Sequence, residues 1–523
     1  MMYVCLTSVK SPAWKTMMEQ VNNEVYESLS TLQKFYEGKN IFLTGGTGFL
    51  GKVLTEKLLR STGVSTIYML VREKKGKGVH ARIDELLDEI IFDKVKLSNQ
   101  KYKHKVIGIS GDCSLAGLGI SLNDRNMLER NVDIVFHAAA TVRFDEDLDL
   151  AYAINVNGTK HVINLCRNME NLKAFVHVST AYANCHLAEI EEKFYEYPVN
   201  YEDVEAMLDK MSKEEIKEST SKILGNWPNT YAFTKALAEA MIQDKTNGMP
   251  IGVFRPAIVV STYKEPFPSW IDNLYGPTGA CAAVASGLLK SMQCKDSGIA
   301  NVVPVDTCVA ALLASAWDVS CQTKERIKEN IPIYNYVSTT ENPITWLEYN
   351  TFNTFYGHDY PFLKSIWCIS FSTTISEHVN VANRIVYHFI PACFLDALLL
   401  ISGQRPKFIK MYQKVHKYTA VIEYFCTRDW TFTNDNVQQL HEKMDSKDKR
   451  IFPMSMRDVH WRDYFKTYVL GIRQYVMKES EESLPESRTR MYRLELLNKT
   501  IKFVIYYIIA SVAWSLIASV FSR

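Results

Sequence analysis

The stretch Asn40-Ile-Phe-Leu-Thr-Gly-Gly-Thr-Gly-Phe-Leu-Gly-Lys52 decides the fold of this chain. A short apolar run precedes its glycines, and apolar residues at helical spacing follow them. Gly45 permits a tight turn, Gly48 lets a pyrophosphate approach the backbone, and Gly51 lets the helix pack on its strand. Surface turns are also glycine-rich, but strand and helix patterns on both sides favour a dinucleotide site. The cofactor-binding residues that we predict in this turn are Gly45, Thr47, Gly48, Phe49, Leu50 and Gly51.

The next apolar run, Thr66 to Val71, predicts a second strand that ends in Arg72. Enzymes that use NAD usually carry Asp or Glu near this point, where it binds the ribose 2′-hydroxyl. Arg72, followed by Lys74 and Lys75, instead suits a 2′-phosphate. NADPH is therefore the predicted cofactor, and a solvated basic loop is the alternative.

Further strands are predicted at 106–109, 132–136, 175–178 and 251–254, and helices at 81–92, 151–169, 231–245 and 303–317. This alternation predicts an α/β fold with a Rossmann-type, doubly wound parallel sheet, whose ligands lie at the carboxyl ends of the strands. Asp112, Ala138 and Asn155 follow such ends and complete the predicted cofactor site. Ser179 and Thr180 place hydroxyls at another end, whereas we interpret His137 as structural.

Tyr231 and Lys235 lie four residues apart, and so project from one face of a predicted helix. A tyrosine and a lysine at this spacing are frequent in any protein, but here they follow a glycine turn and a strand-end hydroxyl pair. An ammonium beside a phenol favours the phenolate, so we expect Lys235 to lower the pKa of Tyr231. The pair is then suited to proton transfer.

Several motifs together resemble the extended short-chain dehydrogenase/reductases and, more narrowly, the alcohol-forming fatty acyl-CoA reductases. They are the glycine turn, Leu70-Val71-Arg72, Val178-Ser179-Thr180-Ala181-Tyr182, Phe254-Arg255-Pro256, Ile390-Pro391-Ala392 and Arg428-Asp429-Trp430. The resemblance covers most of residues 34–476.

The resemblance implies that NADPH reduces a long-chain fatty acyl-CoA to the alcohol by two hydride transfers through an aldehyde, with release of coenzyme A. It implies catalytic roles for Tyr231 as proton donor, for Lys235, which also orients the nicotinamide ribose, and for a strand-end hydroxyl. Of Ser179 and Thr180, we choose Thr180. A membrane-bound sterol or hydroxysteroid dehydrogenase and a non-catalytic NADP-binding membrane scaffold are the alternatives.

The composition excludes other classes of function. The chain has 523 residues, a formal charge of +2 and 11 scattered cysteines without a Cys-x-x-Cys pair. The scattered cysteines predict reduced thiols and no metal site. The net charge does not bear on nucleic acid, but no recognition motif accompanies the basic stretch 403–417, so we expect no nucleic-acid partner.

The run Phe503–Phe521 has 19 residues and no charge, which as a helix spans roughly the hydrocarbon core of a bilayer. Cationic residues precede it, so the body of the protein should face the cytosol; they are Arg488, Arg490, Arg493, Lys499 and Lys502. We predict a tail anchor in the endoplasmic reticulum or the peroxisome. Ser511, Ser515 and Ser519 share one face of this helix and would allow a homodimer.

We expect five parts along the chain. They are an N-terminal extension (1–34), an NADPH-binding reductase domain (35–310), a substrate-side connecting segment (311–380), a mostly helical C-terminal domain (381–477), and a polar linker with the anchor (478–523, membrane helix about 503–521).

Three stretches need interpretation. Glu189–Glu218 carries 11 acidic side chains against four lysines, which indicates a solvated helical insertion over the site. The apolar stretch Ile385–Ser402 is interrupted by polar residues and is interpreted as a core or interfacial helix. Gly403–Lys417 has five cationic side chains and no acidic one. This stretch could be a solvated face, or it could bind an anionic membrane surface or the phosphates of coenzyme A. Of these three interpretations, we favour the membrane surface.

Overall fold

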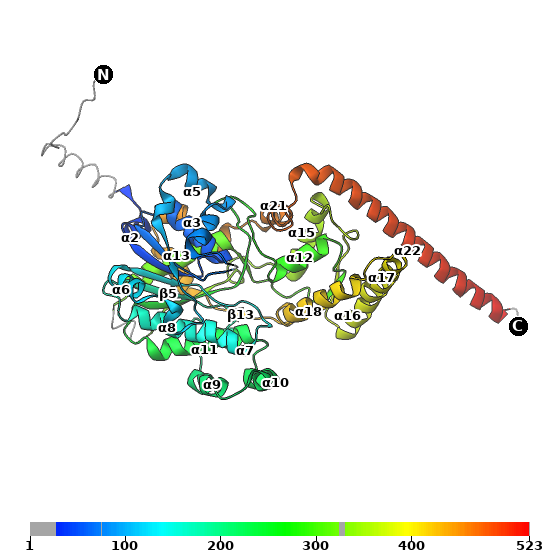
Figure 1. Ribbon diagram of the computed structural model, residues 1–523. Helices are drawn as coiled ribbons and strands as arrows, with labels where there is room; N and C mark the ends of the chain where they lie inside the picture. Colours follow the sequence, from blue (N-terminus) through cyan, green and yellow to red (C-terminus); the bar gives the residue numbers. More distant parts are fainter. Residues whose placement is uncertain (1–27, 75, 324–329, 522–523) are drawn as a thin grey trace, which may run out of the picture.

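The computed structural model describes residues 28–74, 76–323 and 330–521. Most of the predicted N-terminal extension, and Lys75 of the predicted phosphate site, therefore lie outside the described residues. Figure 1 shows an α/β body, a helical region beside it, and one long helix that leaves the body toward the carboxyl end.

A sheet of seven parallel strands forms the centre of the α/β body, in the order β11-β7-β5-β4-β1-β2-β3. The strands are β1 (Asn40–Thr44), β2 (Thr66–Val71), β3 (Val106–Ser110), β4 (Ile134–His137), β5 (Ala174–Val178), β7 (Ile251–Pro256) and β11 (Ile333–Tyr336). The apolar residues of β1 are fully buried, as a strand covered on both faces requires. The predicted Rossmann-type sheet is confirmed.

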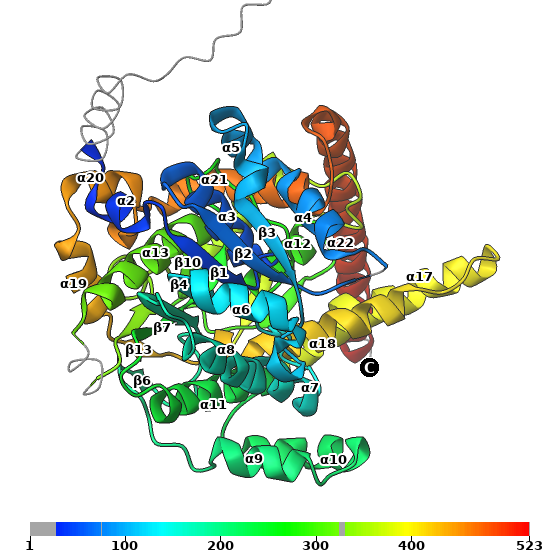
Figure 2. The same cartoon turned by 60° about the vertical axis from the view of Figure 1, so that its left-hand side comes forward.

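Helices cover both faces of this sheet. Helices α3 (Phe49–Ser61) and α13 (Val305–Cys321) pack together on one face, and α8 (Gly158–Cys166) and α11 (Thr230–Lys245) on the other (Figure 2). Strand order reverses between β1 and β4, and a crevice at that reversal is where such sheets bind ligands.

Two predicted helices are interrupted. The helix predicted at 81–92 is α4 (Val79–Leu87) followed by a separate 3-10 turn. The helix predicted at 151–169 consists of α7 (Leu148–Tyr152), a π-helical turn and α8.

The sheet extends beyond the boundary that we expected at residue 310. That position lies inside α13, and β11, from the expected connecting segment, pairs with β7 at the edge of the sheet. Because β11 contains only four residues, the sequence carries little signal for it.

The region after β11 is mostly helical, as expected. Its helices α15 (Trp346–Asp359), α18 (Phe408–Cys426) and α21 (Trp461–Gly471) form a second apolar core together with α12 (Pro277–Ala285), which comes before β11 in the chain. Within it Tyr349 packs edge-on against Phe465 at 5.1 Å between ring centroids. Beyond α18, α19 (Asp435–Lys443) and α20 (Ser446–Ile451) return to the sheet domain, where Asp448 accepts a hydrogen bond from the backbone of Leu32 at 3.0 Å.

Among the described residues, two helical stretches are long and apolar enough to cross a membrane, Glu377–Ile401 and Glu481–Ser515. The first contains α16 (Glu377–Arg384) and α17 (Ile390–Ile401), whose large apolar side chains are mostly exposed. A core helix was therefore the wrong interpretation of this stretch. The second begins in a 3-10 turn (Glu481–Ser483) and continues in α22 (Leu484–Phe521), so most of the expected polar linker is helical.

The acidic insertion forms α9 (Tyr201–Leu208) and α10 (Lys213–Leu224). Tyr152 of α7 donates a hydrogen bond to the carbonyl of Tyr201 at 2.6 Å, which fixes α9 beside the sheet domain. No residue of 189–218 lines the cavity described below, so the expected position over the site was wrong.

Candidate active site

A cavity of about 1230 Å³ opens at the carboxyl ends of the strands. Its walls come from the glycine turn, the loops after β2, β3, β4 and β5, and helices α11, α12, α15 and α18. All but one of the predicted site residues line it: Gly45, Thr47, Gly48, Phe49, Leu50, Gly51, Arg72, Asp112, Ala138, Ser179, Thr180, Tyr231 and Lys235.

Asn155 is the exception. It is 1% exposed and does not line the cavity. Its side-chain amide donates to the Thr234 hydroxyl at 2.9 Å and its carbonyl oxygen accepts from the backbone of Thr141 at 2.9 Å. Asn155 thus holds the loop after β4 in place from behind the cavity wall.

The glycine turn has the geometry that a dinucleotide requires. Gly45 has φ +74°, and a Cβ there would lie 2.6 Å from the backbone of Ala139. A Cβ at Gly51 would lie 2.2 Å from the carbonyl oxygen of Gly45, so α3 packs directly on the turn. Gly48 caps α3 without a side-chain hydrogen bond, which leaves the first N–H groups of the helix for phosphates. These residues fit a bound pyrophosphate.

Cationic side chains gather at the end of the cavity next to β2. Arg72, Lys74 and Arg82 line it there, and Arg82 donates a hydrogen bond to the backbone carbonyl of Arg72. Asp112 lies 3.8 Å from the Arg72 guanidinium and accepts hydrogen bonds from Ser114. Arg82 was not among the predicted residues, because it lies on α4, ten positions from Arg72 in the sequence.

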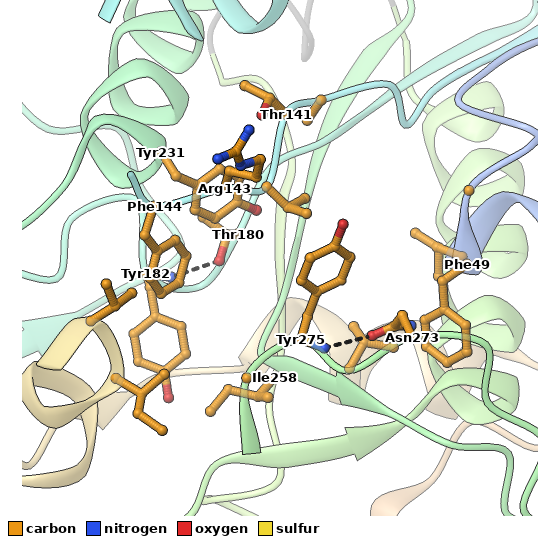
Figure 3. Close-up of a pocket in the computed structure, with 18 of the residues that line it drawn as sticks. Phe49, Thr141, Arg143, Phe144, Thr180, Tyr182, Tyr231, Ile258, Asn273 and Tyr275 are labelled. Carbon is orange, nitrogen blue, oxygen red and sulfur yellow. Dashed lines mark hydrogen bonds between the residues drawn. The ribbon is translucent and has the colours of Figure 1, made fainter. Parts of the chain in front are cut away.

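Tyr231 and Thr180 point into the same part of the cavity, opposite Tyr275 and Asn273 (Figure 3). Burial raises the pKa of the Tyr231 hydroxyl to about 12, and a hydrogen bond with Thr180 offsets only part of that rise. The expected lowering of this pKa by Lys235 was wrong. Desolvation of a phenolate outweighs the other influences here.

Lys235 lies behind Tyr231 and is 2% exposed. Its Nζ donates to the carbonyl oxygen of Val178 at 2.7 Å. Burial lowers the pKa of Lys235 to about 8, and Glu239, one helical turn further on, acts in the opposite direction.

The two strand-end hydroxyls differ in their partners. The Ser179 hydroxyl donates to Oε1 of Glu239 at 2.5 Å, and Glu239 forms a fully buried ion pair with Arg255 at 2.6 Å. The Thr180 hydroxyl lies beside Tyr231 and accepts from the backbone of Tyr182 at 3.2 Å (Figure 3). His137, in contrast, is buried between the hydroxyls of Thr44 and Thr159, in the structural role that we predicted.

Two aromatic residues near Tyr231, Phe144 and Phe425, could not be predicted from the sequence. Phe144, from the loop after β4, stacks on the Tyr231 ring with centroids 5.7 Å apart. Phe425 of α18 packs against Phe144 at 5.4 Å. These contacts bring the helical C-terminal region to the reaction centre.

The part of the cavity lined by α12, α15 and α18 has a mostly apolar wall, and we call it the apolar arm. Its walls include Cys281, Val284, Met292, Trp346, Phe371 and Ile422. A smaller pocket of about 380 Å³ adjoins it and shares Asn350, Thr354 and Phe371. The arm suits an apolar chain that starts at the reaction centre.

Comparison with known proteins adds to this geometry. Two family models, both described as male sterility protein, match residues 43–312 and 387–479. The chain is 45% identical over 491 residues to fatty acyl-CoA reductase wat of Drosophila melanogaster, which covers 94% of this chain and 93% of that protein. It is 36% identical over 475 residues to fatty acyl-CoA reductase 1 of Homo sapiens, covering 89% of this chain and 90% of that protein.

Solved structures share the fold. A reductase domain of a nonribosomal peptide synthetase from Mycobacterium tuberculosis superposes with a TM-score of 0.56 at 16% identity, covering 84% of this chain and 92% of that one. The terminal R domain of the myxalamid pathway gives a TM-score of 0.54 at 17% identity, covering 87% and 97%.

Proposed function

The chain belongs to the fatty acyl-CoA reductase family, and from this premise we propose that it reduces a long-chain fatty acyl-CoA to the alcohol with two NADPH. One acyl-CoA, two NADPH and two protons give one alcohol, coenzyme A and two NADP⁺. The observation that carries the proposal is the meeting of the Tyr231 and Thr180 hydroxyls where the dinucleotide turn and the apolar arm share one cavity.

The bound cofactor would supply the hydride for each reduction. In the first reduction, the thioester carbonyl becomes an oxyanion, and the hydroxyls of Tyr231 and Thr180 would donate hydrogen bonds to it. Collapse of the resulting hemithioacetal breaks the C–S bond and leaves an aldehyde and the thiol of coenzyme A.

The second reduction needs a proton for the alkoxide. The raised pKa keeps Tyr231 protonated at neutral pH, so its hydroxyl can donate that proton. Lys235 would hold the nicotinamide ribose. The hydroxyl of Ser179 is held by Glu239, which favours Thr180 as the catalytic hydroxyl.

The preference for NADPH rests on the cations beside β2. Arg72, Lys74 and Arg82 would bind the 2′-phosphate, and Asp112 would orient Arg72.

We also propose that α22 anchors the protein in a membrane of the endoplasmic reticulum or peroxisome with the reductase body in the cytosol. A long acyl chain partitions into bilayers, so an anchor keeps the enzyme where substrate and product dissolve. The exposed apolar helix α17 would contribute to the same contact.

The test uses the detergent-solubilised chain with palmitoyl-CoA, and follows NADPH oxidation together with product analysis. Two NADPH per hexadecanol are expected, with the rate reduced at least about 10²-fold in Tyr231→Phe. Tyr492→Phe, an exposed tyrosine on α22, is the matched control. One NADPH per aldehyde would contradict the two-step reaction, and turnover of sterols alone would support the dehydrogenase alternative.

A further inference from the structure

Helix α18 presents a divided face to the cavity. Lys410, Lys414 and Lys417 are spaced by four and three residues, so they share one face of the helix. Of these, Lys414 and Lys417 line the cavity, and further along the helix the lining residues become apolar: Val421, Ile422 and Phe425. Read from its first residue, this face is cationic and then apolar.

The apolar end of α18 lies at the reaction centre. Phe425 contacts Phe144, and Phe144 stacks on Tyr231. Lys417 lies two turns earlier in the helix, roughly 12 Å along its axis, and Lys414 lies about one turn beyond it. Two cations thus line the cavity at a fixed distance from the group that meets the substrate carbonyl.

A third cation comes from the loop after β4. Arg143 lines the cavity and extends beside Tyr231 (Figure 3). Asp145 lies between the two elements, 2.9 Å from Lys417 and 3.6 Å from Arg143, and Glu146 lies 3.6 Å from Arg143. The side chains of Arg143 and Lys417 are 57% and 72% exposed. Exposed ion pairs of this kind contribute little stability, so a phosphate can replace the carboxylates as their partner.

We propose that Lys414, Lys417 and Arg143 bind the phosphates of coenzyme A, and that the pantetheine arm lies along α18 with its sulfur end at Tyr231. The inference rests on the proposed function. The phosphates of the dinucleotide have their own partners at the glycine turn and beside β2, which leaves these three cations for the substrate. An acyl-CoA is anionic at one end and apolar at the other. The face of α18 is cationic at one end and apolar at the other, so it complements such a ligand.

The test compares Lys414→Gln/Lys417→Gln with Lys407→Gln/Lys410→Gln, a matched pair at the start of α18 that does not line the cavity. Each protein is assayed in detergent with palmitoyl-CoA, with the phosphate-free thioester S-palmitoyl-N-acetylcysteamine, and with hexadecanal. For palmitoyl-CoA, KM should rise about tenfold in the first variant only, because each lysine loses a charge-assisted contact to phosphate. For the other two substrates, which have no phosphate, KM and kcat should equal those of the wild type.

An unchanged KM for palmitoyl-CoA in Lys414→Gln/Lys417→Gln would overturn the proposal. An equal rise of KM for hexadecanal would also overturn it, because the lysines would then act at the reaction centre. Weaker binding to anionic phosphatidylserine vesicles with an unchanged KM would assign them to lipid headgroups instead. A wild type that does not turn over acyl-CoA would refute the proposed function. The site would then be tested by direct titration with coenzyme A, whose affinity must fall in the variant and not in the control.

Discussion

Ser179 donates its hydroxyl hydrogen to Glu239 across 2.5 Å, while its neighbour Thr180 lies beside Tyr231. These two consecutive residues directly after β5 both line the cavity, but their hydroxyls have different partners. One supports a buried ion pair, and the other faces the cavity where the carbonyl would bind.

We expect Thr180→Val to lower kcat for palmitoyl-CoA by about 10²-fold, the usual cost of losing one oxyanion donor. Ser179→Ala should retain most of the activity but melt at a lower temperature, because buried Glu239 loses a hydrogen bond worth about 2 kcal/mol. The measurements are kcat and the thermal midpoint of each variant in detergent. Equal losses of kcat in both variants would contradict this division of roles.

The pH dependence of kcat/KM for NADPH should reflect the ionisation of Lys235. Burial lowers its pKa to about 8, so the ammonium is lost as pH rises through that value, and kcat/KM for NADPH should fall above it. The native state also binds fewer protons than the unfolded chain between this pKa and the ordinary lysine value, so this group makes stability increase with pH in that window. The Lys235→Met variant should have low activity, and its kcat/KM for NADPH should not fall further as the pH rises through the pKa of Lys235. A wild-type profile that is flat to pH ~10 would refute the assignment.

Cofactor preference should depend on Arg72. Arg72→Ala removes a cation from the end of the cavity beside β2. Because a 2′-phosphate is present only in NADPH, we expect kcat/KM to fall about tenfold with NADPH and to change little with NADH. Steady-state kinetics with both cofactors provide the control within one variant. A parallel loss with both would show that Arg72 supports the fold of the loop and does not select the phosphate.

Acyl chain length should depend on Phe371, a large apolar side chain that lines both the apolar arm and the smaller pocket. Phe371→Ala would join the two spaces, and we expect the preferred acyl-CoA to become longer by several carbons. Phe355→Ala, which changes only the outer pocket, is the control. Relative kcat/KM from 12 to about 24 carbons measures the shift; an unchanged profile in Phe371→Ala would mean that the chain takes another path.

The sequence was sufficient to predict those features whose geometry is determined within one short segment of the chain. The glycine turn between β1 and α3, and Tyr231 with Lys235 on α11, are of this kind, because spacing along one turn or one helix fixes their relative positions. The seven-strand architecture followed from the alternation of strands and helices, except for the short edge strand β11.

Features that depend on distant segments could not be predicted. The raised pKa of Tyr231 depends on burial, to which Phe144 and Phe425 contribute, and α18 lies almost 200 positions after Tyr231. Spacing also could not separate Ser179 from Thr180, since the difference depends on Glu239 and Arg255 behind the strand. The basic stretch 403–417 was treated as one unit, although only Lys414 and Lys417 line the cavity.

The contact between α20 and the start of the sheet domain has a consequence for how the chain can be divided. The Asp448 carboxylate accepts a hydrogen bond from the backbone N–H of Leu32. At the edge of the sheet, the Tyr336 hydroxyl donates a hydrogen bond to the carbonyl oxygen of Met454 at 2.7 Å. A recombinant fragment that stops after α13 would lack both contacts and expose an unpaired sheet edge, so it should aggregate. A soluble enzyme for crystallisation should instead keep every residue through α21 and the first turns of α22, and be shortened only where the apolar part of that helix begins.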